Sequence, residues 1–363
     1  MSVAVGRGVL LVADISGYTD YVVGSPLEYA EDVVSDVTET MVKGLASVIH
    51  VNKVEGDAAF GYALDGELDA SMLLDAIEEC YFAFRGRLRG IAHSVSCTCP
   101  ACTKVTELDL KFIVHHGEFA RRMGARGEEL TGHDVIVVHR LLKNGVNDAL
   151  SLRAYALFTE PCVTALGLDP SSLNLQRHVE PYPDVGDVVG FVSDLDARWH
   201  DEQGRHRVQV GEEEAAFQTD VAVRGNAEAT WELLTSPQKR LLWQVDEIEQ
   251  VDVGGRRATG ASSVCVDGRT KIYEEILDWR PFDYFTERLS LSGGVKAVLT
   301  TSLHPVADGT HVITRIRRDG GPRLAWPTAA RRLRRKLEAR YARLAAIGSV
   351  HISEERRLPL AQR

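Results

Sequence analysis

The sequence predicts an α+β protein of two domains. In the first half of the 363-residue chain, apolar runs alternate with segments of helical periodicity, a pattern typical of helices packed against a mixed sheet. In the second half, strand patterns succeed one another and end in one long helical segment, which is the order of a helix-grip fold. The length agrees with about two domains.

Turn residues and helical spacing define the elements of the first half. Val33, Val37 and Met41 recur at four-residue intervals, which predicts one apolar face of a helix. Gly56 and Asp57 separate two expected strands as a turn. The expected strands are residues 9–12, 51–54, 58–62 and 110–115, and the expected helices are 29–48, 71–88 and 134–143. Extra strands are expected within 182–199.

Strands dominate the second half. Residues 217–223 alternate apolar and polar side chains, as a half-buried strand does, and Asn226 is placed to cap the helix after it. The further strands are expected at 248–253, 260–266, 270–279, 284–291, 297–305 and 311–318. A last helix at 329–346 carries Leu333 and Leu337 on one apolar stripe.

A polar stretch rich in charge and glycine, residues 201–214, separates the two patterns and predicts the boundary. The expected parts are a first domain at 1–165 with a cysteine-rich insertion at about 93–102, an extension and linker at 166–214, a second domain at 215–347 and a tail at 348–363.

Composition limits the class of protein. The net charge of −10 argues against general nucleic-acid binding. The chain has no apolar run of about 18 residues, and its start lacks a cationic stretch followed by an apolar one, so neither a membrane span nor a secretory signal is expected. Six cysteines in such a chain are expected to be thiols or metal ligands. We therefore expect a cytoplasmic protein without integral membrane association.

Two acidic motifs stand at the ends of expected strands. The first, V-A-D-I-S-G-Y-T, contains Asp14, and the second, K-V-E-G-D-A-A-F, contains Asp57. Neighbouring strands that end in this way can present both carboxylates to one divalent ion. Hard oxygen ligands suit Mg²⁺ or Mn²⁺ holding a triphosphate. The alternative is that Asp14 caps a turn and Asp57 lies in a hairpin.

These motifs resemble those of the class III nucleotidyl (adenylyl/guanylyl) cyclases, which read roughly F-x-D-I-x-G-F-T and K-x-x-G-D, and the resemblance covers about residues 8–160. It implies a ferredoxin-like α/β sandwich that converts ATP to cyclic AMP and pyrophosphate with two Mg²⁺ or Mn²⁺ ions per site. The residues implied for metal binding are Asp14, Asp57 and the carbonyl of Ile15, and those implied near the phosphates are the main-chain N–H groups of Gly17, Tyr18 and Thr19.

The same resemblance implies which residues contact the base. Lys53 stands where adenylyl cyclases carry a lysine that contacts adenine, and Glu129 is its expected acidic partner. The pair favours ATP over GTP without excluding GTP. The alternative for Lys53 is a surface lysine at a strand end.

The last helix expected in the first domain departs from the family pattern. Residues 132–141 align with G-x-x-V-N-x-A-x-R-L, so Arg140 falls on the arginine that contacts phosphate in the transition state. Ile136 replaces the asparagine that orients the ribose, and the loss of one such contact costs about 10²–10³ in rate. Asn144 lies on the same helical face as Arg140 and is a candidate replacement, and His139 is a candidate phosphate contact.

In this family, one site combines the metal aspartates of one subunit with the helix residues of the other, which implies a homodimer. Two interpretations stay open. The first is an active adenylyl cyclase in signalling. The second is a degenerate cyclase fold that binds nucleotide or only dimerises.

A second candidate metal site lies in an expected loop. It consists of His93, Cys97, Cys99 and Cys102, a set that satisfies tetrahedral Zn²⁺. Cys80 is a further candidate thiol. A structural zinc ion is therefore expected here, and the alternative is a set of thiols without metal.

Two segments of the second half, E-E-I-L-D-W-R-P-F at 274–282 and residues 226–243, resemble the START-like, polyketide cyclase/dehydrase (SRPBCC) superfamily over about 215–346. The resemblance implies a cavity for a hydrophobic small molecule, and regulation of the first domain by that ligand is a further hypothesis. The aromatic residues expected to line it are Trp231, Trp243, Trp279, Phe282 and Phe285. The alternatives are ordinary core aromatics, or a hydrophobic-ligand carrier that uses the first domain as a scaffold.

Overall fold

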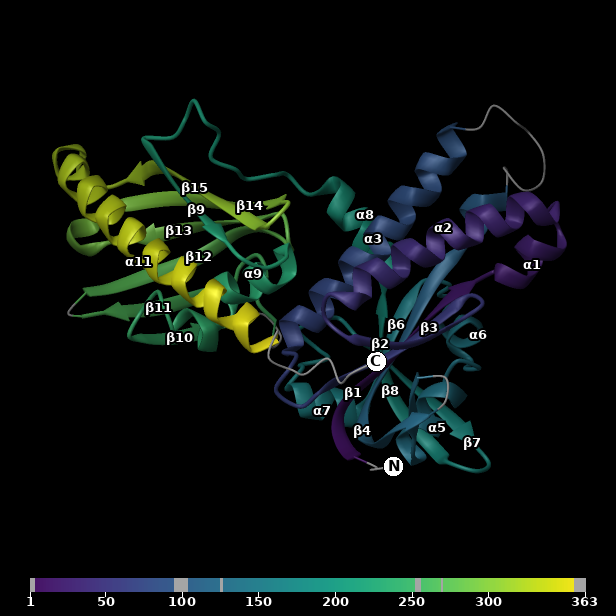
Figure 1. The fold of residues 1–363 in the computed structure, drawn as a ribbon. Coiled ribbons are helices and arrows are strands. Elements are labelled where there is room, and N and C mark those ends of the chain that lie inside the picture. Colours follow the sequence, from purple (N-terminus) through teal and green to yellow (C-terminus); the bar gives the residue numbers. More distant parts are fainter. Residues whose placement is uncertain (1–3, 95–103, 125–126, 252–255, 269, 356–363) are drawn as a thin grey trace. The chain divides into compact units, whose positions relative to one another are not determined.

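The computed structural model describes residues 4–94, 104–124, 127–251, 256–268 and 270–355. The chain divides into two compact units, Met1–Arg205 and His206–Arg363, and each is built on its own sheet (Figure 1). Among the described residues, no helix is both long enough and apolar enough to cross a membrane.

The N-terminal unit carries an eight-stranded sheet in the order β2-β3-β1-β4-β6-β8-β7, with β5 paired to β4 outside this path. Its strands are β1 (Ala4–Ser16), β2 (His50–Glu55), β3 (Ala58–Leu64), β4 (Asp109–Gly124), β5 (Gly127–Thr131), β6 (Tyr155–Thr159), β7 (Gln176–Tyr182) and β8 (Gly186–Asp194). Its helices are α1 (Tyr18–Val23), α2 (Leu27–Ala46), α3 (Ala70–Ser94), the 3-10 turn η1 (Val105–Glu107), α5 (His133–Arg140), α6 (Val146–Leu150), α7 (Glu160–Leu166) and α8 (Leu195–Gly204). β4 and β6 are parallel, and β1 is antiparallel to both of its neighbours, β3 and β4.

The central strand β1 is buried on both faces, because its side chains alternate between two cores. Leu11 and Ala13 pack in the core that contains residues of α2 and α3, whereas Leu10 and Val12 pack in the core that contains residues of α5. The even-numbered side chains of β1 therefore face α5, and this face carries the candidate site.

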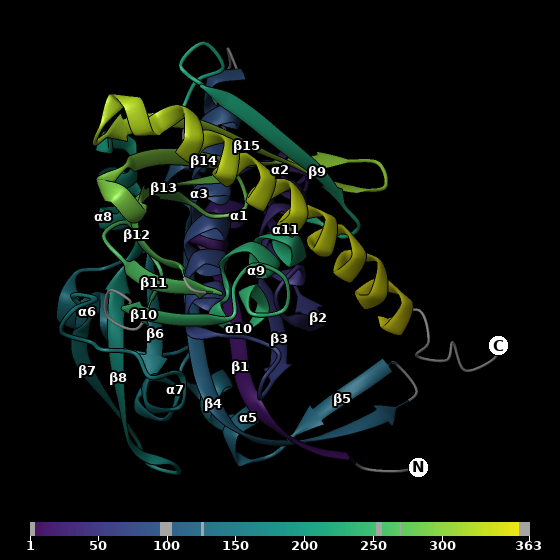
Figure 2. The same cartoon turned by 90° about the vertical axis from the view of Figure 1, so that its left-hand side faces the viewer.

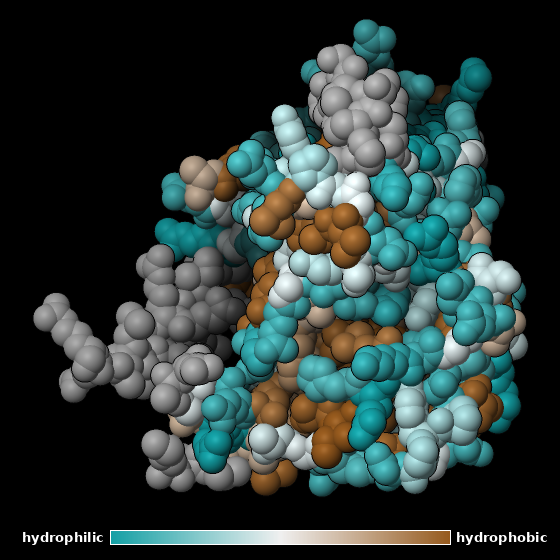
Figure 3. Space-filling model, turned by 90° about the vertical axis from the view of Figure 1, so that its right-hand side faces the viewer, coloured by the Kyte–Doolittle hydropathy of each residue, from teal (hydrophilic) through white to brown (hydrophobic). Residues whose placement is uncertain are grey.

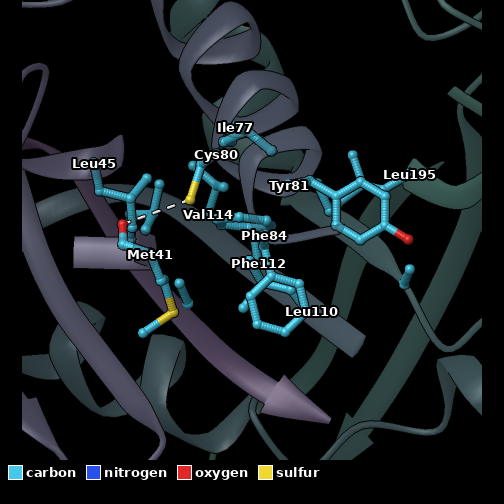
Figure 4. Packing of buried hydrophobic residues seen from close by; sticks show 14 of the residues in the cluster. Met41, Leu45, Ile77, Cys80, Tyr81, Phe84, Leu110, Phe112, Val114 and Leu195 are labelled. Atoms are coloured by element: carbon cyan, nitrogen blue, oxygen red, sulfur yellow. Dashed lines mark hydrogen bonds between the residues drawn. The ribbon is translucent and has the colours of Figure 1, made fainter. Parts of the chain in front are cut away.

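The core beneath α2 and α3 is formed by aromatic and aliphatic side chains (Figure 4). Tyr81, Phe84 and Phe112 are fully buried, and burying a side chain of this size contributes about 1.5–3 kcal/mol. Cys80 of α3 donates a hydrogen bond to the carbonyl oxygen of Met41 over 3.5 Å (Figure 4). Burial raises the pKa of this thiol to about 12.

The 16-residue strand β4 extends beyond its neighbours and forms, with β5, an arm that projects from the body of the unit (Figure 2). Within this arm Arg122 pairs with Glu129 across the two strands. The arm thus carries Glu129, a predicted base contact, on β5, which pairs with the last residues of β4.

The C-terminal unit has a seven-stranded antiparallel sheet in the order β10-β11-β12-β13-β14-β15-β9. Its strands are β9 (Phe217–Val223), β10 (Glu247–Val251), β11 (Ser262–Asp267), β12 (Thr270–Arg280), β13 (Tyr284–Ser290), β14 (Lys296–Val306) and β15 (Gly309–Gly320). Its helices are α9 (Ala227–Thr235), α10 (Pro237–Arg240), the 3-10 turns η2 (Ser292–Gly294) and η3 (Arg323–Ala325), and α11 (Trp326–Glu355). Leu333 and Leu337 of α11 are buried against the sheet, which gives the expected helix-grip arrangement (Figure 1).

The structure assigns to the N-terminal unit two strands and a helix that the sequence placed in the extension and linker at 166–214. β7 and β8 continue the sheet through the pairing of β8 with β6, and α8 follows them. Val192 of β8 is fully buried, so these strands belong to the core of the N-terminal unit.

Candidate functional site

The end of β1 and the turn between β2 and β3 bring the two motif aspartates together. Asp14 pairs with Ala58 of β3 on one side and with Lys111 of β4 on the other. Asp57 occupies the β2–β3 turn, and its carbonyl oxygen accepts a hydrogen bond from the N–H of Ile15 over 3.0 Å. The two acidic residues therefore lie beside each other at one end of the sheet.

The charges of this group are coupled. Burial raises the pKa of the Asp57 carboxyl, the negative charge of Asp14 raises it further, and the positive charge of Lys111 lowers it. The Nζ atom of Lys111 lies 2.9 Å from Oδ2 of Asp14, and each side chain is 18% exposed. Lys111 also donates to the carbonyl oxygen of Leu142 over 3.1 Å. A lysine is thus the counter-ion of the carboxylate pair.

Asp14 and Asp57 are a donor set that fits a hard divalent cation. Mg²⁺ is usually held by one or two carboxylates, with substrate phosphate and water completing its octahedron. Among the described residues, no group of three or more His, Cys, Asp or Glu side chains could hold a metal ion, so the side-chain ligands would be these two carboxylates. Binding of the metal ion by the carbonyl oxygen of Ile15 stays a prediction.

A cavity of about 410 Å³ opens on the face of the sheet that carries α5. Its lining includes Val12 of β1, Phe60 of β3, and Val135 and His139 of α5. Lys53 of β2 and Glu129 of β5 line the same cavity. The structure therefore brings together the two residues that the family resemblance implied for the base, although they are 76 positions apart in the sequence (129 − 53).

Lys53 and Glu129 each have a partner within the chain. The Lys53 ammonium pairs with Glu55, and Glu129 pairs with Arg122 over 2.6 Å. All four side chains are exposed, and ion pairs of this kind contribute about 0–1 kcal/mol. A ligand with suitable hydrogen-bonding groups can therefore replace either partner at little cost.

His139 borders the cavity, and its ring packs against that of Phe60. Its ring centroid lies 4.7 Å from that of Phe60. Burial lowers the pKa of His139, since the cationic form loses hydration. The charge of Glu55 opposes this shift, and the charge of Lys53 adds to it. A neutral imidazole can bind a base or a ribose through a hydrogen bond but brings no positive charge to a phosphate.

Arg140 and Ile136 lie on the outer face of α5. Arg140 pairs with Asp184 over 3.0 Å, and both side chains are more than half exposed. Ile136, at the position of the family's asparagine, is 54% exposed. In the described part of one chain, Arg140 thus contacts Asp184 rather than the carboxylate pair.

Asn144 is occupied by local hydrogen bonds. Its amide nitrogen donates to the carbonyl oxygen of Leu141 over 2.6 Å. Its amide oxygen accepts from the N–H of Val146 over 2.9 Å and from the hydroxyl of Tyr155 over 3.0 Å. This side chain links the end of α5 to α6 and β6, and it would have to break these bonds to contact a ribose.

Gly17, Tyr18 and Thr19 form the turn from β1 into α1. Gly17 has a φ of 85°, a left-handed conformation that favours glycine. Tyr18 and Thr19 open α1, where main-chain N–H groups lack partners within the helix. Their contact with phosphate stays a prediction.

The predicted zinc ligands Cys97, Cys99 and Cys102 lie outside the described residues, as does the side chain of His93. Cys80 is described, and it is a buried thiol of the core between α2 and α3 (Figure 4). Its position explains its burial without a metal ion.

The aromatic residues predicted for the C-terminal cavity pack mainly on one another. The ring of Trp231 lies 4.7 Å from that of Trp279 and 5.6 Å from that of Phe285, both edge-to-face, and 5.9 Å from that of Phe282. Trp243, Trp279 and Phe285 also line the cavity between sheet and helix. Trp231 is fully buried within the aromatic group.

That cavity is small and contains charged groups. Its volume is about 50 Å³, well below the roughly 300 Å³ at which sites for drug-sized ligands begin. Arg240, Glu274 and Glu287 line it. Burial raises the pKa of the Glu287 carboxyl to about 8, and the charge of Glu274 adds to the shift.

Sequence reasoning missed Lys111, Phe60 and the buried pair of Arg240 and Glu274. The sequence predicts the strand at 110–115 that contains Lys111, but it does not predict that Lys111 lies opposite Asp14, because this depends on the register of the two strands. Antiparallel pairing of β1 with β4 supplies that register.

Two protein families match separate parts of the chain. Residues 34–149 match a family described as a protein of unknown function (DUF2652). Residues 214–347 match the family described as polyketide cyclase / dehydrase and lipid transport, in agreement with the sequence motifs of the second half.

Relatives cover parts of the chain only. An uncharacterized protein of Mycobacterium tuberculosis (Rv2561/Rv2562) is 40% identical over 94 residues, which are 26% of this chain and 44% of the relative, so the match spans less than half of that relative's length.

Similar solved structures include a bacterial light-regulated adenylyl cyclase, with a TM-score of 0.41 and 14% identity over 54% of each chain. The adenylyl cyclase CyaB from P. aeruginosa has a TM-score of 0.39 and 15% identity over 53% of this chain and 97% of its own. The guanylyl cyclase Cya2 has a TM-score of 0.41 and 14% identity over 53% and 93%. This chain spans about half the length of the light-regulated enzyme.

Proposed function

We propose that the N-terminal unit binds ATP through a divalent cation and, as a two-fold dimer, converts it to cyclic AMP and pyrophosphate. The observation that supports this most is that Asp14 and Asp57 lie beside each other and close in the chain to Val12 and Ala58, which line the same cavity as Lys53 and Glu129. Asp14 shares a face of β1 with Val12, which lines that cavity, because side chains two residues apart in a strand point the same way. A triphosphate and its base can therefore be held on one face of the sheet.

The reaction joins the ribose 3′-oxygen to the α-phosphorus, breaks the bond from that phosphorus to the bridging oxygen of pyrophosphate, and releases the hydroxyl proton. Divalent cations at Asp14 and Asp57, when bound, neutralise the triphosphate and favour ionisation of the hydroxyl. Lys53 donates a hydrogen bond to a ring nitrogen of adenine, and Glu129 accepts one from the amino group. This arrangement favours adenine over guanine.

Arg140 acts in this proposal on the site of a second copy. Its guanidinium lies at the outer surface of α5 beside the exposed Ile136, and Val54 and Met123 are further exposed apolar side chains of this unit. Figure 3 shows hydrophobic surface gathered in patches on one side of the unit. Exposed apolar surface of this kind is typical of protein interfaces.

Nucleotide binding without turnover is the second candidate, and two observations favour it. Ile136 has no polar atom to orient a ribose, and Asn144 already uses its amide for local bonds. Both observations argue against catalysis. Neither argues against nucleotide binding by the carboxylate pair and the base cavity.

The C-terminal unit is proposed to bind a small hydrophobic molecule and to regulate the N-terminal unit. The family description of residues 214–347 supports the ligand class. A ligand of ordinary size requires the 50 Å³ cavity to widen. Mass spectrometry of molecules released from purified protein by denaturation tests this, and release of polar compounds alone would contradict it.

The decisive experiment incubates the purified chain with ATP or GTP and Mn²⁺ and follows cyclic nucleotide and pyrophosphate by mass spectrometry. Asp57→Ala is the test variant, and Asp187→Ala, an exposed strand residue outside the site, is the matched control. Cyclic AMP from the wild type and the control, absent from Asp57→Ala, supports the cyclase. Nucleotide that binds without product supports the second candidate, and absence of both binding and product rejects both.

A further inference from the structure

Lys111 is held in place by two groups at the candidate metal site. Its ammonium bonds the carboxylate of Asp14 over 2.9 Å and the carbonyl oxygen of Leu142 over 3.1 Å. Both side chains of the ion pair are 18% exposed, so the pair is much less hydrated than the pairs of Lys53 and Glu129. Less hydration makes its attraction stronger.

The site contains two negative charges and one positive charge. Asp57 lies next to the end of β1, where its carbonyl oxygen accepts a hydrogen bond from Ile15 over 3.0 Å, and Lys111 contacts the neighbouring Asp14 over 2.9 Å. A divalent cation that binds both carboxylates must share Asp14 with the ammonium. Two cations on one carboxylate repel each other strongly in a partly buried site.

We propose that Lys111 competes with the divalent cation for Asp14, so that metal binds well only after the ammonium has moved away. This inference rests on the proposed function, because it assigns the freed ammonium to the triphosphate. The phosphate oxygens give Lys111 a new anionic partner close to the old one. Nucleotide binding therefore favours metal binding, and metal binding favours nucleotide binding to the same extent.

This competition distinguishes Lys111 from a residue that only supports the fold. Loss of a supporting residue would weaken metal binding, since Asp14 would lose its position. Loss of a competitor strengthens metal binding. The sign of the change in metal affinity therefore decides between the two roles.

The test measures Mn²⁺ binding to the full chain without nucleotide, by the electron paramagnetic resonance signal of free Mn²⁺. Lys111→Met is expected to bind Mn²⁺ about tenfold more tightly than the wild type, because one positive charge near the ion is removed. Lys111→Arg keeps the charge and is expected to bind like the wild type. Lys43→Met, at an exposed helical ion pair on α2, is the matched control. Lys111→Gln replaces Lys111→Met if thermal melting shows that Met is not tolerated.

A second measurement adds the non-cyclising analogue α,β-methylene ATP. It is expected to raise the Mn²⁺ affinity of the wild type more than that of Lys111→Met, so the two affinities converge. Equal or weaker Mn²⁺ binding by Lys111→Met, with the analogue still bound, overturns the competition and leaves the proposed function standing. If no variant binds either Mn²⁺ or the analogue, the proposed function fails and the competition fails with it.

Discussion

Arg240 and Glu274 form an ion pair inside the C-terminal unit, with Nη2 and Oε2 2.6 Å apart and the side chains 8% and 5% exposed. The hydroxyl of Ser263 donates to the same carboxylate oxygen over 2.7 Å, and Nε of Arg240 donates to the amide oxygen of Gln244 over 2.7 Å. The pair is thus hydrogen-bonded as well as charged. This pair lines a cavity for which the sequence motifs predicted only aromatic residues.

Removal of one partner of this pair is expected to destabilise the C-terminal unit. Glu274→Leu leaves Arg240 buried without its counter-charge, which costs about 3–5 kcal/mol. The double variant Arg240→Met/Glu274→Leu is expected to recover most of that loss, because both charges of the pair are removed together. Urea unfolding followed by tryptophan fluorescence measures both effects. Glu275→Ala, which breaks the more exposed pair with Arg288 and leaves the pair of Arg288 with Asp319, serves as control and should cost about 1 kcal/mol or less.

The stability of the C-terminal unit is expected to depend on the ionisation of Glu287. Glu274, Arg240 and Arg340 face this carboxyl, whose pKa burial raises from 4.5 to about 8. The folded state therefore binds the Glu287 proton more tightly than the unfolded chain does. The protonated carboxyl thus contributes to the free energy of unfolding in full below about pH 4.5, and this contribution is lost as the pH rises through about 8. The free energy of unfolding should fall between these values, and Glu287→Gln should remove that fall. An unchanged pH profile in Glu287→Gln, with the exposed Glu249→Gln as comparison, would contradict this.

Replacement of Ile136 by asparagine is expected to raise cyclic nucleotide formation. The side chain is 54% exposed, so the change leaves the core intact, and the new amide can orient a ribose in a dimer. A single transition-state contact is worth about 10²–10³ in rate, which sets the upper limit of the gain. Steady-state assays with ATP and Mn²⁺ measure it, and Ile136→Ala is the control without an amide. Equal rates of cyclic nucleotide formation in Ile136→Asn and Ile136→Ala would show that the missing asparagine does not limit the reaction.

Gly8 is expected to tolerate no side chain. A Cβ atom there would lie 2.0 Å from the carbonyl oxygen of Ala63 and 2.8 Å from the Cα atom of Leu64. Gly8→Ala must therefore shift β3 away from β1 and should destabilise the N-terminal unit by about 1–3 kcal/mol. Gly86→Ala in α3, where nothing lies within 4 Å of the added Cβ, should instead be neutral or stabilise the unit by up to about 1 kcal/mol. Thermal and urea unfolding compare the two variants.

Local patterns predicted most of the C-terminal fold. β9 has the expected bounds, because the alternation of apolar and polar residues that predicts a strand can be seen within the strand's own sequence. The side chain of Asn226 caps α9 as expected, accepting a hydrogen bond from the N–H of Ala229 over 2.9 Å. The two-domain α+β class was confirmed for the same reason, since each half has its own periodicity.

Contacts between distant segments could not be predicted in this way. Lys111 meets Asp14 only because β1 and β4 pair in one register, and a shift by one residue would turn its side chain to the opposite face. Arg240 and Glu274 are 34 positions apart, on a short helix and a strand, and the sequence around each residue does not indicate that the two form a buried pair. The motif aspartates could be placed together because turn residues mark where each strand ends.

Three buried thiols among the described residues can each report the opening of the unit in which they lie. Cys80 and Cys162 lie in the core of the N-terminal unit, and Cys265 lies in that of the C-terminal unit. Burial raises the pKa of each thiol to about 12, so the reactive thiolate is scarce at neutral pH while the units are closed. Alkylation at Cys265 compared with Cys80, read peptide by peptide after brief labelling, would therefore time the opening of the two halves independently in a single sample.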